Sequence, residues 1–521
     1  MRDQDLAGRI GRLKTRSGVI ETPYLFPVVD PSLQEQYVKP SELMEIGFRG
    51  IITNAYLLKK VSPSPIDVHK HLNFNGVVMT DSGAYQILKY GGIEVSNREI
   101  IEYQCAIKSD IGVILDIPTG FDASRDEAFS SADETLKRAQ EAVNIISDPL
   151  CRETLWTLPV QGGIHLDILR DYAKKSVDIF YDGFSIFALG SPTTLLEQYM
   201  FDKVAEMIYT VRSEIPFAAP LHLFGAGHPL IIPFAVALGV DLFDSASYIL
   251  YAKDDRYITR RGTYKLKNLD YSTCQCPVCS KYSPKELLEL PKKERVRLLS
   301  LHNLYVIREE INEVKQAIKE NRLWEYLEYK ANSHPAAKRI FMTMLKYLEY
   351  LYKHSPQSKP NTRAVFILSE YSIYNPKILS SRRRSIQIRN RGGENTLAFL
   401  PYSLAENNRI EKLVAHFSKE LNINLQTLKL YLYYPIIGVI PAELHSVYPY
   451  SHFELGFSPT DNAISDLAYL IFEIFLKSDN VNGVWIVTCK EDWQEKLYGK
   501  IAKIAENSDI GSKVKKIEFA C

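Results

Sequence analysis

The sequence predicts an α/β fold in which a (β/α)₈ TIM barrel is followed by a C-terminal α/β region. Two observations predict the barrel. Short apolar runs rich in β-forming residues alternate with amphipathic segments before residue 270, and several of these runs end in a polar or glycine-rich cluster. Strands that alternate with helices are typical of βαβ units and a parallel sheet.

Eight apolar runs predict the barrel strands. They are Val19–Val29, Gly50–Leu57, Val77–Asp81, Ile111–Ile117, Leu155–Gln161, Gly183–Leu189, Pro220–Phe224 and Asp241–Ser245. Amphipathic segments such as Arg125–Ser147, Leu166–Val177 and Leu195–Ile215 lie between them and are expected to be helices. Eight such units in about 250 residues fit a TIM barrel. A doubly wound sheet is the alternative.

Polar clusters at the ends of these runs predict a functional site. Asp81-Ser82-Gly83 follows one run, Gln161-Gly162-Gly163 another, and Asp244 stands near the end of the eighth. The carboxyl ends of all strands meet at one rim of a TIM barrel, where its active sites lie. Residues that are far apart in the sequence are therefore expected to converge there.

Composition restricts the class of protein. The chain has 521 residues, of which 46% are hydrophobic and 24% charged, and its formal net charge is +1. No apolar run reaches the ~20 residues of a membrane span, and residues 1–5 lack the apolar stretch of a secretory signal. We expect a cytoplasmic protein. Any nucleic-acid site must then be a local patch on a neutral body.

Three parts are expected along the chain. Residues 1–325 form the catalytic barrel with a metal-binding segment at 270–305, residues 326–360 a helical connection, and residues 361–521 a C-terminal α/β accessory region. After the cysteine cluster, charged amphipathic segments predict helices over Pro284–Gln316 and Trp324–Tyr352.

Three of the seven cysteines lie together and predict a zinc site. Cys274, Cys276 and Cys279 are followed by His302. Three thiolates and an imidazole can complete a tetrahedral zinc site, and a site with four protein ligands is structural. The alternative is a group of buried free cysteines. The other four cysteines are scattered, and seven in a chain of this length are too few for a disulfide scaffold. The clustering of Cys274, Cys276 and Cys279, in a compartment expected to be reducing, favours metal binding over disulfides.

Three carboxylates at predicted strand ends suggest chemistry at an anomeric carbon. Asp81, Asp116 and Asp244 could supply a nucleophile and an acid/base, as the paired carboxylates of retaining glycosidases do. For a single aspartate after a strand, helix capping is the competing interpretation. Nearby, Tyr85 or Phe187 could stack on a flat ligand.

Basic residues interleaved with tyrosines predict RNA contacts. The candidates are Lys253, Arg256, Arg260, Arg261, Arg382, Arg383 and Arg384. Cationic side chains beside aromatic ones suit an RNA backbone and unstacked bases. A solvated charged surface is the alternative, above all for the cluster at 382–384.

Four motifs together resemble the tRNA-guanine transglycosylases. They are Gly11-Arg12-Leu13 with Val19-Ile20-Glu21-Thr22-Pro23, Thr80-Asp81-Ser82-Gly83, Val240-Asp241-Leu242-Phe243-Asp244-Ser245, and the Cys-X-Cys-X₂-Cys…His set. The continuation through Tyr251–Tyr257 is similar to the archaeal branch, which makes the precursor of archaeosine. The resemblance covers residues 8 to 305.

The resemblance implies an activity and a set of roles. The enzyme would exchange guanine at position 15 of the tRNA D arm for 7-cyano-7-deazaguanine (preQ0), without ATP. Asp244 matches the nucleophile and Asp81 the general acid/base. The residues that match the base pocket are Ser82, Asp116, Gln161, Phe187, Ala188, Leu189 and Gly190, and those that match the zinc ligands are Cys274, Cys276, Cys279 and His302.

The resemblance also bears on possible partners and on rival functions. Archaeal members end in a PUA-type RNA-binding domain, which the C-terminal region does not clearly contain, so we expect a separate PUA-type protein to assist tRNA binding. A homodimer is also considered. The rival functions are a paralogous archaeosine synthase, a non-catalytic tRNA-binding subunit, a metal-dependent barrel hydrolase and the bacterial-type queuine exchange.

Overall fold

The computed structural model describes most of the chain in two compact units, residues 1–354 and 355–521. The described residues are 3–34, 36–86, 94–356, 359, 364–387, 395–405, 409–419, 423–448, 452–456, 458–506 and 511–519. The helices in the segment expected to be a connection, residues 326–354, belong to the first unit.

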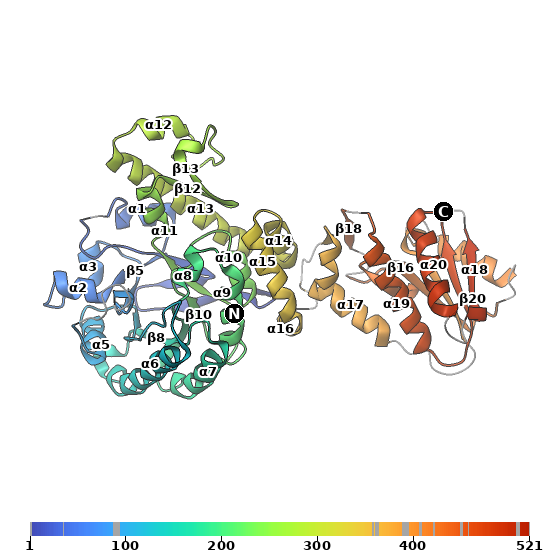
Figure 1. Cartoon of the computed structure of the whole chain (residues 1–521), viewed down its shortest axis with the longest axis horizontal. Helices are drawn as coiled ribbons and strands as arrows, with labels where there is room; N and C mark the ends of the chain where they lie inside the picture. The colour runs from blue at the N-terminus through green and yellow to red at the C-terminus, as the bar shows by residue number, and fades with distance from the viewer. Residues whose placement is uncertain are drawn as a thin grey trace. The chain divides into compact units, whose positions relative to one another are not determined.

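The first unit is built on a closed parallel barrel (Figure 1). Its strands are β4 (Tyr24–Pro27), β5 (Gly50–Asn54), β6 (Val77–Asp81), β7 (Ile111–Val113), β8 (Leu155–Val160), β9 (Phe184–Leu189), β10 (Leu221–Leu223) and β11 (Leu242–Ser245). Every paired neighbour in the order β4-β11-β10-β9-β8-β7-β6-β5 is parallel, and a bridge between Val28 and Ile52 joins the two ends. The TIM barrel is confirmed. The doubly wound sheet is excluded, because the bridge just after β4 joins it to β5 and closes the sheet.

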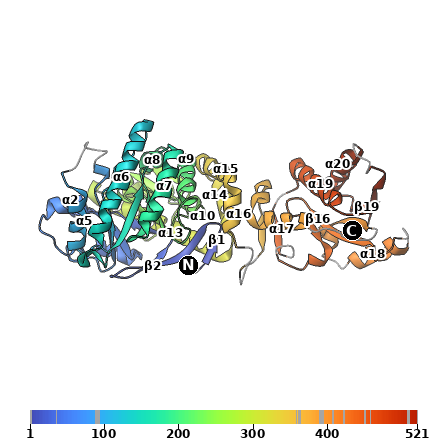
Figure 2. The same cartoon turned by 90° about the horizontal axis from the view of Figure 1, so that it is seen from below.

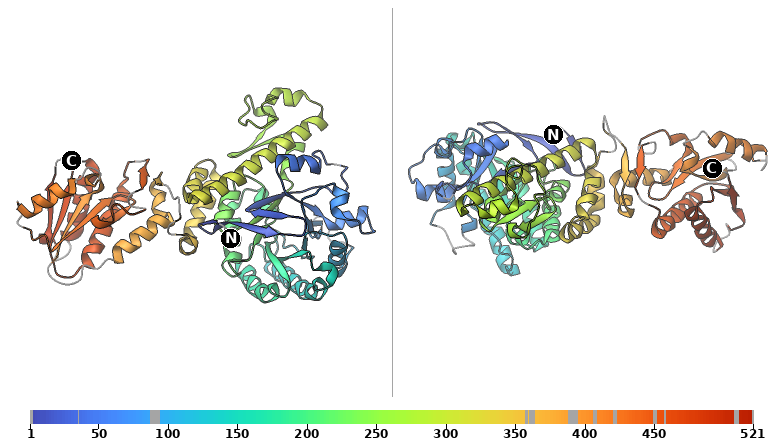
Figure 3. Two further views of the ribbon diagram at one scale, coloured as in Figure 1. Left: turned by 180° about the vertical axis from the view of Figure 1, so that it is seen from behind. Right: turned by 90° about the horizontal axis from the view of Figure 1, so that it is seen from above.

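The expected first strand, Val19–Val29, is two strands. β3 (Val19–Thr22) ends before Pro23 and pairs with β2 (Gly8–Lys14), which also pairs with β1 (Asp3–Asp5). Only β4 enters the barrel. Ile20 of β3 packs into the apolar barrel interior, so the small antiparallel sheet covers the N-terminal ends of the barrel strands (Figure 3).

Helices surround the barrel, as Figure 1 shows for α5, α6 and α7. The helices of this ring are α1 (Pro40–Ile46), α2 (Ala55–Val61), α3 (Val68–Leu72), α5 (Asn97–Ala106), α6 (Arg125–Ile146), α7 (Leu166–Phe180), α8 (Thr193–Glu197), α9 (Phe201–Arg212), α10 (Ile232–Ala237) and α11 (Ser247–Lys253). The start of α6 is fixed by a capping box between Ser124 and Glu127. The single helix expected over 195–215 is the pair α8 and α9.

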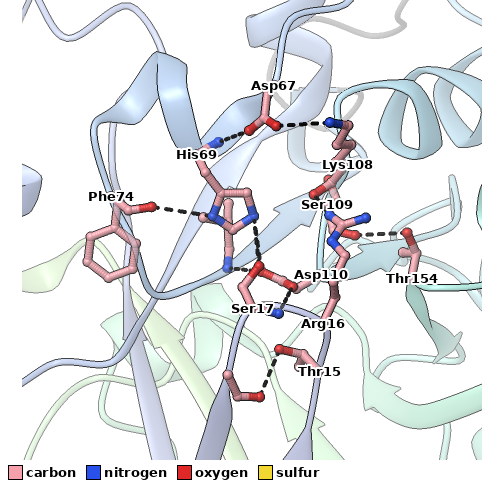
Figure 4. Close-up of polar contacts among 12 residues, drawn as sticks. Thr15, Arg16, Ser17, Asp67, His69, Phe74, Lys108, Ser109, Asp110 and Thr154 are labelled. Carbon is pink, nitrogen blue, oxygen red and sulfur yellow. Dashed lines mark hydrogen bonds and ion pairs between the residues drawn. The ribbon is translucent and has the colours of Figure 1, made fainter.

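The turn between β2 and β3 is fastened to the barrel by a buried carboxylate (Figure 4). Asp110 accepts hydrogen bonds from the amides of Ser17 and Val78, both at 2.9 Å. His69 Nε2 lies 3.2 Å from the same carboxylate. Burial lowers the pKa of His69, but the hydrogen bond and the charge of Asp110, together with the Phe74 carbonyl and the charge of Asp67, raise that pKa above its usual value.

A segment after β11 extends the barrel and carries the cysteines. It contains β12 (Arg256–Thr259), β13 (Gly262–Lys265), η2 (Leu266–Asn268), α12 (Pro284–Glu289) and α13 (Lys292–Glu320), followed by α14 (Leu323–Ala331), α15 (Pro335–Met344), η3 (Leu345–Tyr347) and α16 (Leu348–His354). The expected helix over 284–316 is interrupted at Leu290 and Pro291. Figure 2 shows β1 and β2 near α13, and the two strands contact this helix.

The second unit is a mixed α/β domain, as predicted for the C-terminal region. Its five-stranded sheet has the order β17-β16-β15-β19-β20, and only β17 is antiparallel to its neighbour. The strands are β15 (Asn395–Pro401), β16 (Leu428–Tyr434), β17 (Gly438–Pro441), β19 (Val481–Thr488) and β20 (Val514–Glu518), with a small pair of β14 (Val365–Ile367) and β18 (Phe453–Leu455).

Helices and apolar clusters complete this unit. The helices are α17 (Pro376–Gln387), α18 (Arg409–Lys419), α19 (Asp461–Leu476) and α20 (Asp492–Glu506). The short 3₁₀ turns of this unit are η4 (Glu370–Tyr374), η5 (Tyr402–Leu404), η6 (Ala442–Leu444) and η7 (Gly511–Lys513). The first unit contains a further 3₁₀ turn, η1 (Pro149–Cys151). Two buried apolar clusters draw on alternate residues of β15: Leu397 and Phe399 belong to one, Ala398 and Leu400 to the other. The sheet therefore buries both faces.

Two cysteines that the sequence analysis left unpaired form a disulfide. Cys105 at the end of α5 and Cys151 in η1 are bonded, with their Cα atoms 4.9 Å apart. The sequence analysis did not predict this pairing, in which the fold brings together two residues that are 46 positions apart. Among the described residues, no helix has the length and apolar character needed to cross a membrane.

Candidate active site and metal site

A cavity of about 450 Å³ opens at the C-terminal ends of the barrel strands. Asp81, Asp116 and Asp244, which stand at or just after the ends of β6, β7 and β11, all line it. The other predicted residues in its wall are Tyr85, Gln161 and Gly190. Residues from distant parts of the sequence therefore converge at this rim.

Asp81 is held at the end of β6 by its neighbours. Asn54 Nδ2, at the end of β5, donates to Asp81 Oδ2 at 3.1 Å, and the amide of Gly83 lies 3.3 Å from the same oxygen. Burial raises the pKa of Asp81 to about 7, and the charges of Asp116 and Asp244 act in the same direction. A carboxyl group with such a pKa can hold or release a proton near neutral pH.

Asp116 and Gln161 form a polar pair just after the ends of the neighbouring strands β7 and β8. Gln161 Nε2 donates to Asp116 Oδ2 at 2.5 Å, while Gln161 Oε1 accepts from Ser191 Oγ at 2.9 Å and from the amide of Thr119 at 3.1 Å. These bonds fix which end of the amide faces Asp116. Burial raises the pKa of Asp116 to about 6, and the bond from Gln161 opposes that rise.

Asp244 is anchored through one oxygen. His222 Nε2 lies 2.9 Å from Asp244 Oδ1, and the amide of Gly225 lies 3.0 Å from the same atom. His222 is fully buried on β10, next to β11 in the barrel. Sequence reasoning missed both His222 and Asn54, since each lies within an apolar run where a polar residue is easily interpreted as part of the strand.

A second buried histidine lies in the cavity wall. His228 Nδ1 accepts the amide of Leu230 at 3.1 Å, and its Nε2 lies 3.1 Å from Tyr199 Oη. Tyr199 Oη is in turn 2.8 Å from Thr263 Oγ1 of β13. Burial lowers the pKa of His228 to about 3, so this imidazole is neutral. The chain of contacts links the cavity wall to the β12–β13 hairpin.

Four of the residues expected to contact the base are not among those that line the cavity. Phe187 is fully buried and stacks on Phe180 of α7, with ring centroids 4.2 Å apart. It therefore points away from the barrel axis, and its expected stacking on a base was wrong. Ser82, Ala188 and Leu189 are buried behind the cavity wall. The aromatic side chains that line the cavity are Tyr85, Phe121, Phe224 and Tyr251.

The four predicted metal ligands come together as a group that could hold a metal ion. Cys274, Cys276, Cys279 and His302 offer ligand atoms that all lie within 4.8 Å of one another. His302 Nδ1 lies 3.3 Å from Cys279 Sγ and 3.6 Å from Cys276 Sγ. The edge of a zinc tetrahedron with such ligands is about 3.5 Å, so the donor set fits zinc.

The orientation of His302 supports metal binding. Its Nε2 lies 2.9 Å from the carbonyl oxygen of Ile258, to which it donates, so Nδ1 keeps its lone pair toward the thiols. The ring is buried and stacks on Tyr257, with centroids 3.7 Å apart. Tyr257 Oη also lies 3.2 Å from Cys279 Sγ.

The basic residues after β11 differ in their surroundings. Arg261 is exposed at the tip of the β12–β13 hairpin. Arg256 pairs with Asp254 and lies over the ring of Tyr251, 5.3 Å from its centroid. Lys253 lies over Tyr37, 5.6 Å from its centroid. All three remain at least partly accessible.

Two arginines proposed for RNA are engaged within the protein. Arg260 contacts Glu310 at 3.1 Å and donates to Tyr326 Oη at 2.8 Å, in a network that also contains the buried Lys330. Arg382 is only 8% exposed and donates to the carbonyl oxygen of Ile436 at 3.0 Å and to Asp466. Its guanidinium stabilises the second unit, so the RNA contact expected of Arg382 was wrong. Arg383 is partly exposed and Arg384 is exposed.

Comparisons with known proteins identify the family. The family described as queuine tRNA-ribosyltransferase matches residues 4–336. The tRNA-guanine(15) transglycosylase of Saccharolobus solfataricus is 44% identical over 496 residues, which are 94% of this chain and 96% of that protein. The protein of the same name from Aeropyrum pernix is 50% identical over 381 residues, 73% of each chain. That from Pyrococcus furiosus is 41% identical over 459 residues, 87% of this chain and 70% of the relative. The match over residues 4–336 and the identity to these relatives show that the chain belongs to the tRNA-guanine transglycosylase family.

Proposed function

We propose that this protein replaces guanine at position 15 of the tRNA D arm with 7-cyano-7-deazaguanine, the base exchange that precedes archaeosine. The observation that carries the proposal is the convergence of Asp81, Asp116 and Asp244 on one cavity. Three carboxylates in one enclosed site can divide nucleophile, acid/base and base recognition among them.

Asp244 acts as the nucleophile in this proposal. One of its carboxylate oxygens bonds to ribose C1′ as the C1′–N9 bond to guanine breaks, and the bonding electrons leave with N9. The leaving base takes a proton from Asp81, whose raised pKa of about 7 suits a general acid. The incoming base then returns a proton to Asp81 while its nitrogen displaces the ester oxygen of Asp244. Atoms and charge balance without ATP, since one glycosidic bond replaces another.

Asp116 and Gln161 recognise the base. A guanine-like ring carries donors on one edge and an acceptor beside them, and a carboxylate next to a fixed amide can pair with both. Gly190 leaves room for this pairing, and Tyr85 at the rim offers a ring face. Because position 15 lies inside folded tRNA, the nucleotide must be extruded to reach the cavity.

We further propose that Cys274, Cys276, Cys279 and His302 hold one zinc ion. With four protein ligands it supplies no catalytic position and takes no part in the exchange. It fastens the loop after β13 to α13, which carries His302.

Trapping of the covalent intermediate tests the proposal. Wild-type protein incubated with tRNA and a slow substrate base should give a denaturation-resistant protein–RNA adduct, and labelled guanine should leave tRNA faster when 7-cyano-7-deazaguanine is added. Asp244→Asn should abolish the adduct. If the adduct persists in Asp244→Asn and disappears in Asp81→Asn, the two roles are reversed. Absence of guanine exchange in the wild-type protein would refute the activity itself.

A further inference from the structure

The two oxygens of the Asp244 carboxylate have different surroundings. His222 Nε2 and the amide of Gly225 both donate to Oδ1, at 2.9 and 3.0 Å. Two donors on one oxygen hold the carboxylate plane and concentrate their interaction on that atom. Oδ2 receives neither bond, and the Asp244 side chain is 13% exposed toward the cavity it lines.

His222 is held in place by packing. The residue is fully buried, its ring lies 4.7 Å from that of Phe224, and it stacks on Phe26 at 6.4 Å between centroids. Its Nδ1 has no hydrogen-bond partner among the residues that the structure describes. The only polar contact of the imidazole in that part of the chain is therefore with Asp244, and the tautomer with a proton on Nε2 satisfies it.

We infer that His222 is a positioning residue that, with the Gly225 amide, fixes the nucleophile so that Oδ2 is the oxygen that attacks C1′. The inference rests on the proposed function. A carboxylate tied through Oδ1 cannot rotate freely, so Oδ2 keeps one direction toward the bound ribose. Such orientation can contribute strongly to rate, and a misplacement of about 1 Å can lower it by about 10²-fold.

The same arrangement assists the second half of the exchange. When Oδ2 carries the ribose, Oδ1 is the carbonyl oxygen of the ester, and the two donors remain on it. As the incoming base displaces the ester, negative charge returns to the carboxylate, where His222 and Gly225 already point at Oδ1. Donors aimed in advance at a developing charge stabilise the transition state.

Two substitutions at His222 test this role. His222→Leu removes the donor and keeps an apolar side chain, and His222→Gln places an amide N–H near the former Nε2. We expect His222→Leu to lower kcat for guanine exchange by about 10²-fold, with the KM for tRNA unchanged. His222→Gln should recover most of kcat and of adduct formation. If His222→Leu keeps wild-type kcat, or His222→Gln is as slow as His222→Leu, the inference is wrong.

His69→Leu is the control for loss of an imidazole that pairs with a buried aspartate. His69 also pairs with a buried aspartate, Asp110, but at the N-terminal ends of the strands (Figure 4). Both leucine variants are expected to unfold at lower temperature, while only His222→Leu loses kcat. An equal loss of kcat in both leucine variants would show that His222 contributes to stability and has no positioning role.

A crystal structure of the trapped adduct gives a second, independent test. We expect the ester to join ribose to Oδ2, with His222 Nε2 still on Oδ1. An ester through Oδ1 would overturn the inference and leave the proposed function intact. An adduct that forms equally in Asp244→Asn would instead refute the proposed nucleophile.

Discussion

Gly190 approaches Gln161 so closely that a side chain at Gly190 would displace the amide: a Cβ there would lie 2.2 Å from Gln161 Nε2. The same amide holds Asp116. We predict that Gly190→Ala raises the KM for the incoming base by about tenfold or more, because loss of one good hydrogen bond to a charged group costs about 1.5–3 kcal/mol. Steady-state kinetics with tRNA at saturation measures it.

Gly499→Ala provides the control for this substitution. Gly499 lies in α20, and a Cβ there would meet no atom within 4 Å. Alanine in a helix is favoured over glycine by about 1 kcal/mol, so this variant should be slightly more stable and fully active. Normal base affinity in Gly190→Ala would show that Gln161 does not take part in recognition.

Protonation of Asp81 predicts a pH-dependent stability. An unfolded aspartate has a pKa of about 3.9, and in the folded protein burial raises the pKa of Asp81 to about 7. Between these values the folded state binds more protons than the unfolded state, so the free energy of unfolding falls as pH rises through this window. Asp81→Asn has no carboxyl group at this position, so its free energy of unfolding lacks this pH dependence. Its stability relative to wild type should therefore be greater at pH 8 than at pH 4.5.

Urea unfolding of both proteins at the two pH values measures the effect. The exposed Asp178→Asn variant on α7 is the control and should differ from wild type equally at both pH values. An Asp81→Asn difference that does not change with pH would contradict the raised pKa.

The strand ends of the barrel could be predicted because each apolar run stops at a polar residue. Asp81, Gln161 and Asp244 follow this rule, and each lines the cavity. The direction of the Phe187 side chain could not be predicted from the same rule, because successive residues of a strand point to opposite sides of the sheet. Ile186 packs in the barrel interior and Phe187 packs outside against Phe180. The local pattern of this apolar run did not show which of the two residues faces the barrel interior.

Contacts between distant segments could not be predicted. His222 reaches Asp244 only because β10 and β11 are neighbours in the closed sheet. Cys105 meets Cys151 because α5 ends beside η1. Arg382 lies in a run of three arginines that is typical of a charged surface, yet one face of α17 turns it toward Ile436 and Asp466. In each case the partner is set by packing and not by local pattern.

Loss of the proposed zinc should destabilise the first unit. Cys276→Ser removes a buried ligand of the Cys₃His group. We expect zinc content to fall from one ion per chain and the melting temperature to fall with it, because binding energy at a structural site contributes to folding. Metal analysis and calorimetry measure both. Cys276→Ser protein that lacks metal but melts as wild type would contradict a structural role.

The Cys105–Cys151 disulfide should stabilise the barrel. It closes a loop with a sequence separation of 46 residues. Loop-closure entropy predicts a contribution of about 4 kcal/mol to the free energy of unfolding. We expect Cys105→Ser with Cys151→Ser, or reduction of the wild-type protein, to lower stability by up to this amount while kcat is retained, since neither residue lines the cavity. Because Cys489 is also disulfide-bonded, reduction should lower the stability of the wild-type protein more than that of the double variant. An equal effect on both would assign the loss to other cysteines.

The exposed arginine of the β12–β13 hairpin should contribute to tRNA affinity. Arg261 is exposed, and the hairpin is linked to the cavity wall through Thr263, Tyr199 and His228. Arg261→Ala should weaken tRNA binding and reduce the slope of log affinity against log salt by about 1. Arg382→Ala should leave that slope unchanged and lower stability, because Arg382 is buried against Asp466.

A separate PUA-type protein is expected to complete tRNA binding. The chain carries a formal charge of only +1, and of the basic residues considered for RNA, Arg260 and Arg382 are engaged within the protein. A protein that neutralises few phosphates releases few counterions, so the chain alone should bind tRNA weakly and with a shallow salt dependence. Adding a basic RNA-binding partner should tighten binding and steepen the slope, while kcat at saturating tRNA stays the same. The measurement is tRNA affinity of the purified chain across a salt series, with and without the partner. Tight, steeply salt-dependent binding by the chain alone would show that no partner is needed, because all the required phosphate contacts would then come from this chain.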